Sequence, residues 1–209
     1  CNDNGINHLH GGMVGFDRRI WKATVLPDGL QLQYESPDGE EGYPGRLSVT
    51  AIYRLTQDTL SIEFFAQSDK DTVCNLSSHS YFNLGGHASG SVGSQMIQVD
   101  ADRYTPLASN NAPTGEVASV EGTPFDLRQP VRFDAGWDSD FTQIALAGGY
   151  DHNYIPAGDG LRPFAQASCP QTGITLTVTS DMPGVQLYTG NFLRDDLPEG
   201  KQHAKYDRR

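Results

Sequence analysis

The 209-residue sequence has few cysteines and no long hydrophobic run. Its three cysteines, Cys1, Cys74 and Cys169, are widely spaced and include no CxxC pair. This pattern favours neither a disulfide framework nor a zinc knuckle, and it indicates a reducing compartment. No apolar run reaches the roughly eighteen residues that a membrane helix needs, and no charged-then-apolar leader opens the sequence. We therefore expect a soluble, cytoplasmic protein.

Basic residues are also scarce relative to acidic ones. Fifteen Lys and Arg stand against 26 Asp and Glu, which gives a formal net charge of −11. A chain with this balance repels nucleic acids and anionic membrane surfaces. A neutral small molecule is the partner class that fits best, whereas the choice between monomer and homodimer does not follow from the sequence.

Apolar residues at helical 3.6-residue spacing are missing, and a period of two replaces them. Apolar and polar residues alternate in residues 21–26, 30–34, 47–55, 60–66 and 174–179, as they do in half-buried strands. Pro27-Asp28-Gly29 separates the first two of these runs, as a hairpin turn does. With 23 glycines and 12 prolines to form turns, the sequence predicts an all-β antiparallel sandwich.

The sequence predicts a single domain over residues 1–209, since this length suits one large all-β domain. The richest cluster of turn residues, 36–45, has strand patterns of the same kind on both sides. We interpret it as a surface loop and not as a linker between domains. The Gly- and Ser-rich residues 85–93 are interpreted as a mobile loop.

Histidines lie beside residues that bind hydroxyl groups. Histidine has an unperturbed pKa of about 6.5 and can hold or release a proton near neutral pH. If residues 75–82 form a strand, His79 and Tyr81 point to the same face. In the strand expected further along the chain, Gln186 and Tyr188 likewise share a face. Two such polar and aromatic faces, brought together, would make a concave site suited to a sugar.

Five segments, in this order, resemble the signature segments of the aldose 1-epimerase (galactose mutarotase) family. They are Asn7-His8-Leu9-His10-Gly11-Gly12, Gly15-Phe16-Asp17-Arg18-Arg19-Ile20-Trp21, His79-Ser80-Tyr81-Phe82-Asn83-Leu84, Gly149-Tyr150-Asp151-His152-Asn153-Tyr154, and Pro183-Gly184-Val185-Gln186-Leu187-Tyr188-Thr189-Gly190-Asn191-Phe192-Leu193. Each segment alone is a weak signal, but their joint order is a specific one. The resemblance implies a large antiparallel β-supersandwich.

The resemblance also implies a reaction, the interconversion of the α and β anomers of a galactose- or glucose-class hexose by ring opening and closure. It implies that His79 is the general acid and that His10 is a second catalytic imidazole, which also binds the sugar near its ring oxygen. Tyr81, Asp151 and Gln186 are the further implied sugar-binding residues. No metal or organic cofactor is required, because the sugar supplies both the leaving and the attacking oxygen. Which aldose is preferred does not follow from the sequence.

Two parts of the family pattern are missing. The resemblance places the catalytic base on a glutamate in a Phe-x-Leu-Glu-like segment beyond Arg209, and an Asn-Arg pair that holds the sugar before Cys1. We therefore expect the sequence to be an internal portion of a longer domain, without its N-terminal and C-terminal segments. Glu199 is a poor substitute for the base, because its Pro-Glu-Gly context predicts an exposed turn.

Two other functions stay open. A carbohydrate-binding relative that does not catalyse would share the fold, and the presence or absence of a glutamate after Arg209 distinguishes it from an enzyme. Alternatively, His8 and His10 together with His79 or His152 could bind a metal as in a cupin barrel. That pattern usually has a glutamate a few residues after the histidine pair, whereas residues 11–15 offer only glycine and apolar side chains.

Overall fold

Antiparallel strands dominate the structure, a computed structural model that describes residues 1–3, 5–193, 199–204 and 206. The chain divides into two units, Cys1–Ser80 and Tyr81–Arg209, which we call unit 1 and unit 2. All strand pairs in both units are antiparallel among the described residues. The predicted all-β antiparallel class is confirmed.

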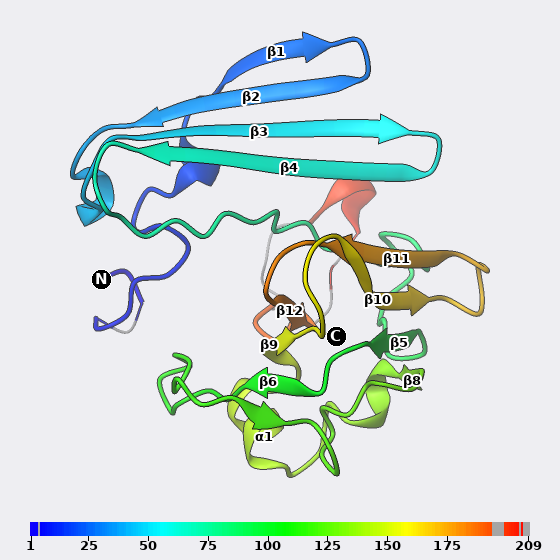
Figure 1. Ribbon diagram of the computed structural model, residues 1–209. Coiled ribbons are helices and arrows are strands. Elements are labelled where there is room, and N and C mark those ends of the chain that lie inside the picture. Colours follow the sequence, from blue (N-terminus) through cyan, green and yellow to red (C-terminus); the bar gives the residue numbers. More distant parts are fainter. Residues whose placement is uncertain (4, 194–198, 205, 207–209) are drawn as a thin grey trace. The chain divides into compact units, whose positions relative to one another are not determined.

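Unit 1 is built on a four-stranded meander in the order β1-β2-β3-β4 (Figure 1). Its strands are β1 (Lys22–Leu26), β2 (Gly29–Ser36), β3 (Leu47–Thr56) and β4 (Thr59–Ser68). Leu26 pairs with Gly29, which confirms the hairpin turn expected there. In β3 the alternation buries Val49 and Ala51, at 2% and 4% exposure. One face of this sheet is therefore apolar, as the period of two predicts.

The connections of unit 1 contain two short 3-10 helices. One, Phe16–Arg18, precedes β1. The other, Glu40–Gly42, lies in the turn-rich residues 36–45, which join β2 to β3 as predicted for a loop. The strand considered for residues 75–82 is not formed, since no strand occurs between β4 and residue 96. This segment is rich in serine and lacks alternating apolar residues, so a strand here would have no apolar face to bury.

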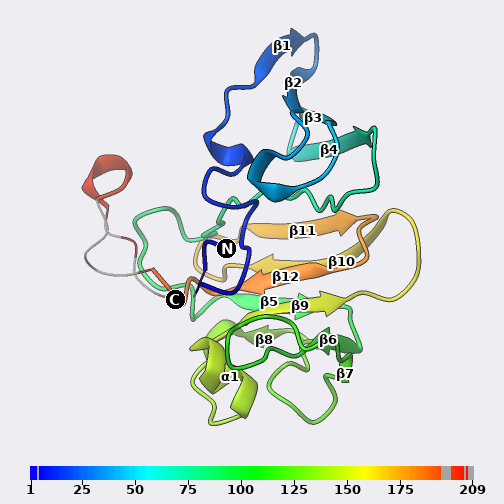
Figure 2. The same cartoon turned by 90° about the vertical axis from the view of Figure 1, so that its left-hand side faces the viewer.

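Unit 2 contains two four-stranded sheets, ordered β11-β10-β5-β8 and β12-β9-β6-β7 (Figure 2). Their strands are β5 (Met96–Val99), β6 (Arg103–Thr105), β7 (Ala118–Ser119), β8 (Val131–Arg132), β9 (Asp151–Ile155), β10 (Arg162–Ser168), β11 (Thr175–Ser180) and β12 (Val185–Tyr188). Side chains of both sheets meet in one core, with Val99 from the first sheet and Tyr104 and Tyr154 from the second. Two further 3-10 helices are Phe133–Ala135 and Lys201–His203.

One short α-helix, α1 (Thr142–Ala147), was not predicted. It buries Ile144 and Ala147, three positions apart, on one side. A single buried pair is too little to give a periodic signal in the sequence. The helix ends at Gly148, whose φ of 70° is a left-handed conformation that glycine adopts without strain.

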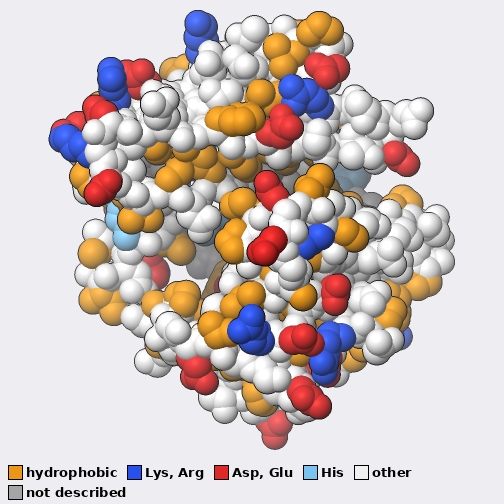
Figure 3. Space-filling view, in the orientation of Figure 1, with side chains coloured by type: hydrophobic (Ala, Val, Ile, Leu, Met, Phe, Trp, Pro, Cys, Tyr) orange, Lys and Arg blue, Asp and Glu red, His pale blue; other side chains and the backbone are white. Residues whose placement is uncertain are grey.

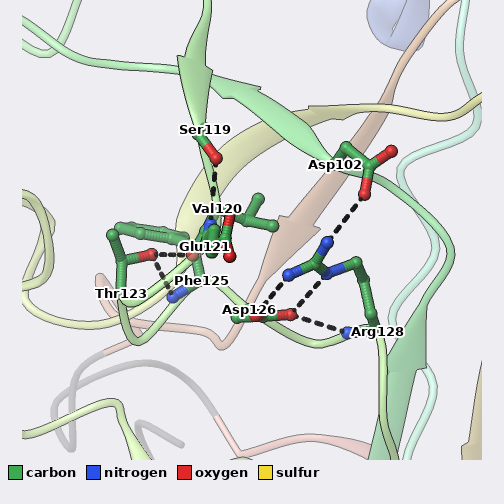
Figure 4. A network of polar contacts seen from close by, with 8 residues as sticks. All are labelled: Asp102, Ser119, Val120, Glu121, Thr123, Phe125, Asp126 and Arg128. Atoms are coloured by element: carbon green, nitrogen blue, oxygen red, sulfur yellow. Dashed lines mark hydrogen bonds and ion pairs between the residues drawn. The ribbon is translucent and has the colours of Figure 1, made fainter.

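A polar network shapes the turn that carries Phe125, whose ring lies in the core of unit 2 (Figure 4). The Arg128 guanidinium donates to both carboxylate oxygens of Asp126, at 2.8 and 2.7 Å, and to Asp102 at 2.9 Å. These bonds hold the pKa of Asp126 below its usual range. Nearby, the Thr123 hydroxyl donates to the Val120 carbonyl at 2.6 Å and accepts from the Phe125 N–H at 3.1 Å. The turn thereby directs Phe125 into the core, where it is fully buried.

The surface mixes charges of both signs. On the face shown in Figure 3, Lys and Arg side chains are interspersed with Asp and Glu side chains. Among the residues that the structure describes, no helix combines the length and apolar character needed to cross a membrane.

Candidate active site

Unit 1 brings together the two histidines that are predicted to be catalytic. The rings of His10 and His79 lie edge to face, with their centroids 5.0 Å apart and their planes at 78°. His79 lies in the irregular segment after β4, and His10 lies in a turn with a φ of 51°. Both side chains are exposed. Two imidazoles at this distance offer paired ring nitrogens that can accept or donate protons.

The turn that carries His10 is fixed by polar side chains from elsewhere in unit 1. The Glu41 carboxylate accepts hydrogen bonds from the backbone N–H groups of Met13 and Val14, at 2.9 and 3.2 Å. The Asn2 side chain both accepts from the Leu9 N–H and donates to the Leu9 carbonyl, each at 2.8 Å. These bonds hold the turn on both sides of His10.

Glycine is required next to the Glu41 carboxylate, which anchors the turn that carries His10. A Cβ atom at Gly12 would lie 2.3 Å from a carboxylate oxygen of Glu41, and Gly12 has a φ of 103°. Gly12 therefore lets the Glu41 carboxylate approach the backbone. Glu41 was not predicted as a site residue, and the turn-rich cluster that contains it gave no signal beyond that of a loop.

Unit 2 pairs the predicted carboxylate with the predicted amide. In the ladder of β9 and β12, Asp151 lies opposite Tyr188 and Asn153 lies opposite Gln186, so these four side chains share one face. The Gln186 amide donates to the Asp151 carboxylate at 2.8 Å. Carboxylate and amide groups in this arrangement are able to bind the hydroxyl groups of a sugar.

An aromatic surface adjoins this polar face. The ring of Tyr188 stacks with that of Phe192, with centroids 6.2 Å apart and planes at 23°, and lies 5.8 Å from the ring of Tyr81. Tyr81 and Phe192 are each 58% exposed, so their rings are accessible from solvent. Burial and the nearby Asp151 charge raise the pKa of Tyr81, which keeps its hydroxyl protonated at neutral pH. Phe192 was not predicted as a site residue.

Buried polar groups fix the backbone that leads into Asp151. The Asn191 amide donates to the carbonyls of Ala147 and Tyr150, at 3.1 and 2.8 Å. The Thr189 hydroxyl accepts from the Tyr150 N–H at 3.1 Å and donates to the Asn191 side-chain oxygen at 2.6 Å. Both residues belong to the segment 183–193 that resembles a family signature, but no role is predicted for either from the sequence. Because their partners are mostly backbone groups, the sequence alone could not have revealed that role.

Gly149 makes this arrangement possible. Its φ is 143°, and a Cβ atom there would lie 2.4 Å from the side-chain oxygen of Asn191. The glycine before Tyr150 is therefore a packing requirement of the Asn191 amide. The expectation that His79 and Tyr81 share a surface stays a prediction, because the division between the two units falls between Ser80 and Tyr81.

The described residues give no support to the metal alternative. Among them, no group of three or more His, Cys, Asp or Glu side chains is arranged to hold a metal ion. His8 packs its ring against Tyr43, edge to face, with centroids 5.0 Å apart. Cys1, Cys74 and Cys169 are free thiols. The glutamate expected beyond Arg209 lies outside the described residues.

Comparison with known proteins gives the family. The sequence model of the aldose 1-epimerase family matches residues 1–208. The chain is 42% identical over 205 residues to galactose mutarotase of Bos taurus, covering 98% of this chain and 58% of that protein. It is 43% identical over 201 residues to galactose mutarotase of Homo sapiens, covering 96% of this chain and 57% of that protein. The chain thus belongs to the aldose 1-epimerase family.

A solved structure agrees with this assignment. The crystal structure of galactose 1-epimerase from Lactobacillus acidophilus NCFM matches with a TM-score of 0.80 and 34% sequence identity, covering 92% of this chain and 57% of that one. The fold predicted from the family resemblance is confirmed. The chain spans 57% to 58% of the length of the two mutarotases described above.

Proposed function

We propose that the protein is an aldose 1-epimerase that interconverts the α and β anomers of a galactose- or glucose-class hexose. The observation that carries the proposal is the pair formed by His10 and His79 in a chain of the aldose 1-epimerase family. Paired imidazoles are suited to proton transfer, which ring opening requires. The net charge of −11 agrees with a neutral substrate.

The reaction needs one proton to be given and one to be taken. We assign His79 as the general acid that protonates the ring oxygen while the bond between C1 and that oxygen breaks. A base removes the proton of the anomeric hydroxyl in the same step, and the open-chain aldehyde results. Rotation about the C1–C2 bond and reversal of both proton transfers close the ring as the other anomer. Acid and base groups of this kind contribute about 10²- to 10⁴-fold each.

The remaining predicted residues bind the sugar, and one of them, His10, also takes part in catalysis. We assign His10 to the ring oxygen as the second imidazole, and Asp151, Gln186 and Tyr81 to the sugar hydroxyls. The Asp151 carboxylate is supported as an acceptor by its strand position and by its bond with Gln186. The base stays assigned to the glutamate expected beyond Arg209. Since the sugar supplies the leaving and attacking oxygens, the proposal includes no metal or organic cofactor.

Polarimetry tests this proposal. Freshly dissolved α-D-galactose and α-D-glucose are followed with the full-length protein, with its His79→Ala variant and with buffer alone. His87→Ala is the matched control, because His87 is an exposed histidine outside the proposed site. We expect the wild type and the control to speed the approach to anomeric equilibrium, and His79→Ala to lose that effect. A wild type no faster than buffer on any aldose would instead support a carbohydrate-binding relative.

We also propose a cytoplasmic location. The support is the three free thiols, which suit a reducing compartment. Cell fractionation tests it, and recovery of the protein from an oxidising compartment would contradict it.

A further inference from the structure

His152 is a buried imidazole that the proposed reaction does not use. It follows Asp151 in β9, and its side chain points to the opposite face of the sheet, where it is 0% exposed. The Phe125 ring packs against it edge to face, with centroids 4.5 Å apart, and Tyr104 lies at 5.9 Å. A buried polar ring needs partners for its nitrogens, and their identity shows what the ring does.

The first partner is Gln143, a residue of α1. The Leu107 N–H donates to the Gln143 side-chain oxygen at 2.7 Å, and the Gln143 amide nitrogen donates to the Leu107 carbonyl at 3.0 Å. These two bonds fix which end of the amide is the oxygen. That oxygen lies 3.1 Å from Nε2 of His152. Because an oxygen accepts, Nε2 must carry the proton.

The second partner is the backbone of Asp151. With the proton on Nε2, a neutral ring has a lone pair on Nδ1. The Asp151 N–H donates to this Nδ1 at 3.2 Å. Burial lowers the pKa of His152 to about 4, so the ring is neutral at pH 7 and Nδ1 stays an acceptor. A chain of hydrogen bonds thus runs from Leu107 through Gln143 and His152 to the peptide group of Asp151.

We propose that His152, held by Gln143 in the tautomer protonated at Nε2, is a positioning residue that fixes the backbone of Asp151 and so directs its carboxylate. The inference rests on the sugar-binding role proposed above for Asp151. His152 acts from the buried face, while the Gln186 amide holds the carboxylate on the other face. The purpose of α1 in this scheme is to present Gln143 to both Leu107 and His152.

Two amide variants distinguish the roles of the two ring nitrogens of His152. His152→Asn places an acceptor near the position of Nδ1 and lacks the Nε2 donor, whereas His152→Gln places an amide near Nε2 and lacks the acceptor for Asp151. Both remove the buried ring, so a purely structural role predicts equal kinetic losses. In mutarotation assays on the full-length protein, we expect His152→Asn to keep KM for galactose within about threefold of wild type. His152→Gln should raise KM at least tenfold. Equal KM and kcat for the two variants would overturn the proposal.

Two NMR measurements do not depend on activity. In the wild type, the ¹⁵N shifts of the His152 ring should report a protonated Nε2 and a bare Nδ1, and the opposite tautomer would overturn the proposal even if neither variant folds. The Asp151 amide resonance should move in His152→Gln and stay near its wild-type position in His152→Asn. A protein that shows this difference but no mutarotation would refute the proposed function while leaving the positioning role intact.

Discussion

His10 in unit 1 and Asp151 in unit 2 are held by anchors of different chemistry. His10 lies in a turn whose backbone is bound by the charged Glu41 carboxylate. Asp151 lies in a strand whose flanking backbone is bound by neutral groups, namely Asn191, Thr189 and His152, all of them buried. The imidazole proposed to lie near the ring oxygen is thus carried by a turn, while the carboxylate proposed to bind the sugar hydroxyls is built into a strand. Sites on strands are held more precisely than sites on loops.

The largest expected effect separates the roles of the two regions. His10→Gln should lower kcat for mutarotation by about 10²- to 10⁴-fold, because it removes a catalytic imidazole. Asp151→Asn should act mainly on KM, raising it about 10- to 100-fold, since hydrogen bonds to a charged acceptor contribute about 1.5–3 kcal/mol. Steady-state polarimetry at several galactose concentrations measures both parameters. A common pattern of kcat and KM changes in the two variants would break the comparison.

The buried anchor of unit 2 should make stability depend on pH. The pKa of His152 is lowered to about 4 by burial, against about 6.5 in the unfolded chain. Between these values the unfolded state binds a proton that the folded state does not. The free energy of unfolding should therefore fall by up to about 3 kcal/mol as the pH drops from about 6.5 to about 4.

Denaturant unfolding of the wild type and His152→Asn at several pH values checks this dependence. The variant should lack the fall that His152 causes, whereas His87→Asn, at an exposed position, should keep it. If the wild type and His152→Asn showed parallel pH dependence, His152 would not be the group responsible.

Two adjacent glycines sharpen the comparison within unit 2. Gly148→Ala places a side chain in open space at a φ of 70°, which should cost about 1 kcal/mol. Gly149→Ala should cost about 2–3 kcal/mol. The new Cβ would lie 2.4 Å from the side-chain oxygen of Asn191 and would therefore also displace that side chain. Urea unfolding measures both free energies. Equal destabilisation by the two substitutions would mean that the Asn191 side chain keeps its place even with a Cβ atom at residue 149.

The smallest expected effect concerns the charged anchor of unit 1. Glu41→Gln keeps one acceptor oxygen but loses the charge, and should lower the free energy of unfolding by about 1 kcal/mol. Glu35→Gln is the control, because the Glu35 carboxylate is exposed and forms an ion pair of 3.7 Å with Arg46. It should stay within about 0.5 kcal/mol of wild type. If the Glu41 variant were as stable as the control, the charge of Glu41 would not contribute to holding the turn.

Much of the fold could be predicted from the period-two pattern, and the exceptions have local causes. The hairpin at residues 27–29 and the strands of unit 1 followed from alternation and turn residues. Residues 75–82, which were only conditionally considered as a strand, form none, because they lack the alternating apolar residues that would give a strand a face to bury. The helix α1 escaped notice because six residues are less than two turns.

For the candidate site, the sequence predicted the side chains of the proposed site but not the groups that hold their backbone in place. His10, His79, Asp151 and Gln186 were found through motifs that the chain shares with a known family. Glu41 and Asn191 could not be found in this way, because they bind backbone groups 27 to 44 residues away. Nearly every residue has a backbone N–H and carbonyl, so a residue of any type can be the partner in such a bond, and the sequence does not indicate which one it is.

The pairing of β9 with β12 has a consequence for how the chain folds. Asp151 and Gln186 occupy one face of this ladder, and the fully buried His152 and Tyr154 occupy the other. A slip of one strand by a single residue would exchange these faces, sending a carboxylate into the interior and two rings into water. Misaligned pairings of these strands are thus strongly destabilised, and the same alternation that places Asp151 and Gln186 on one face selects the correct alignment during folding.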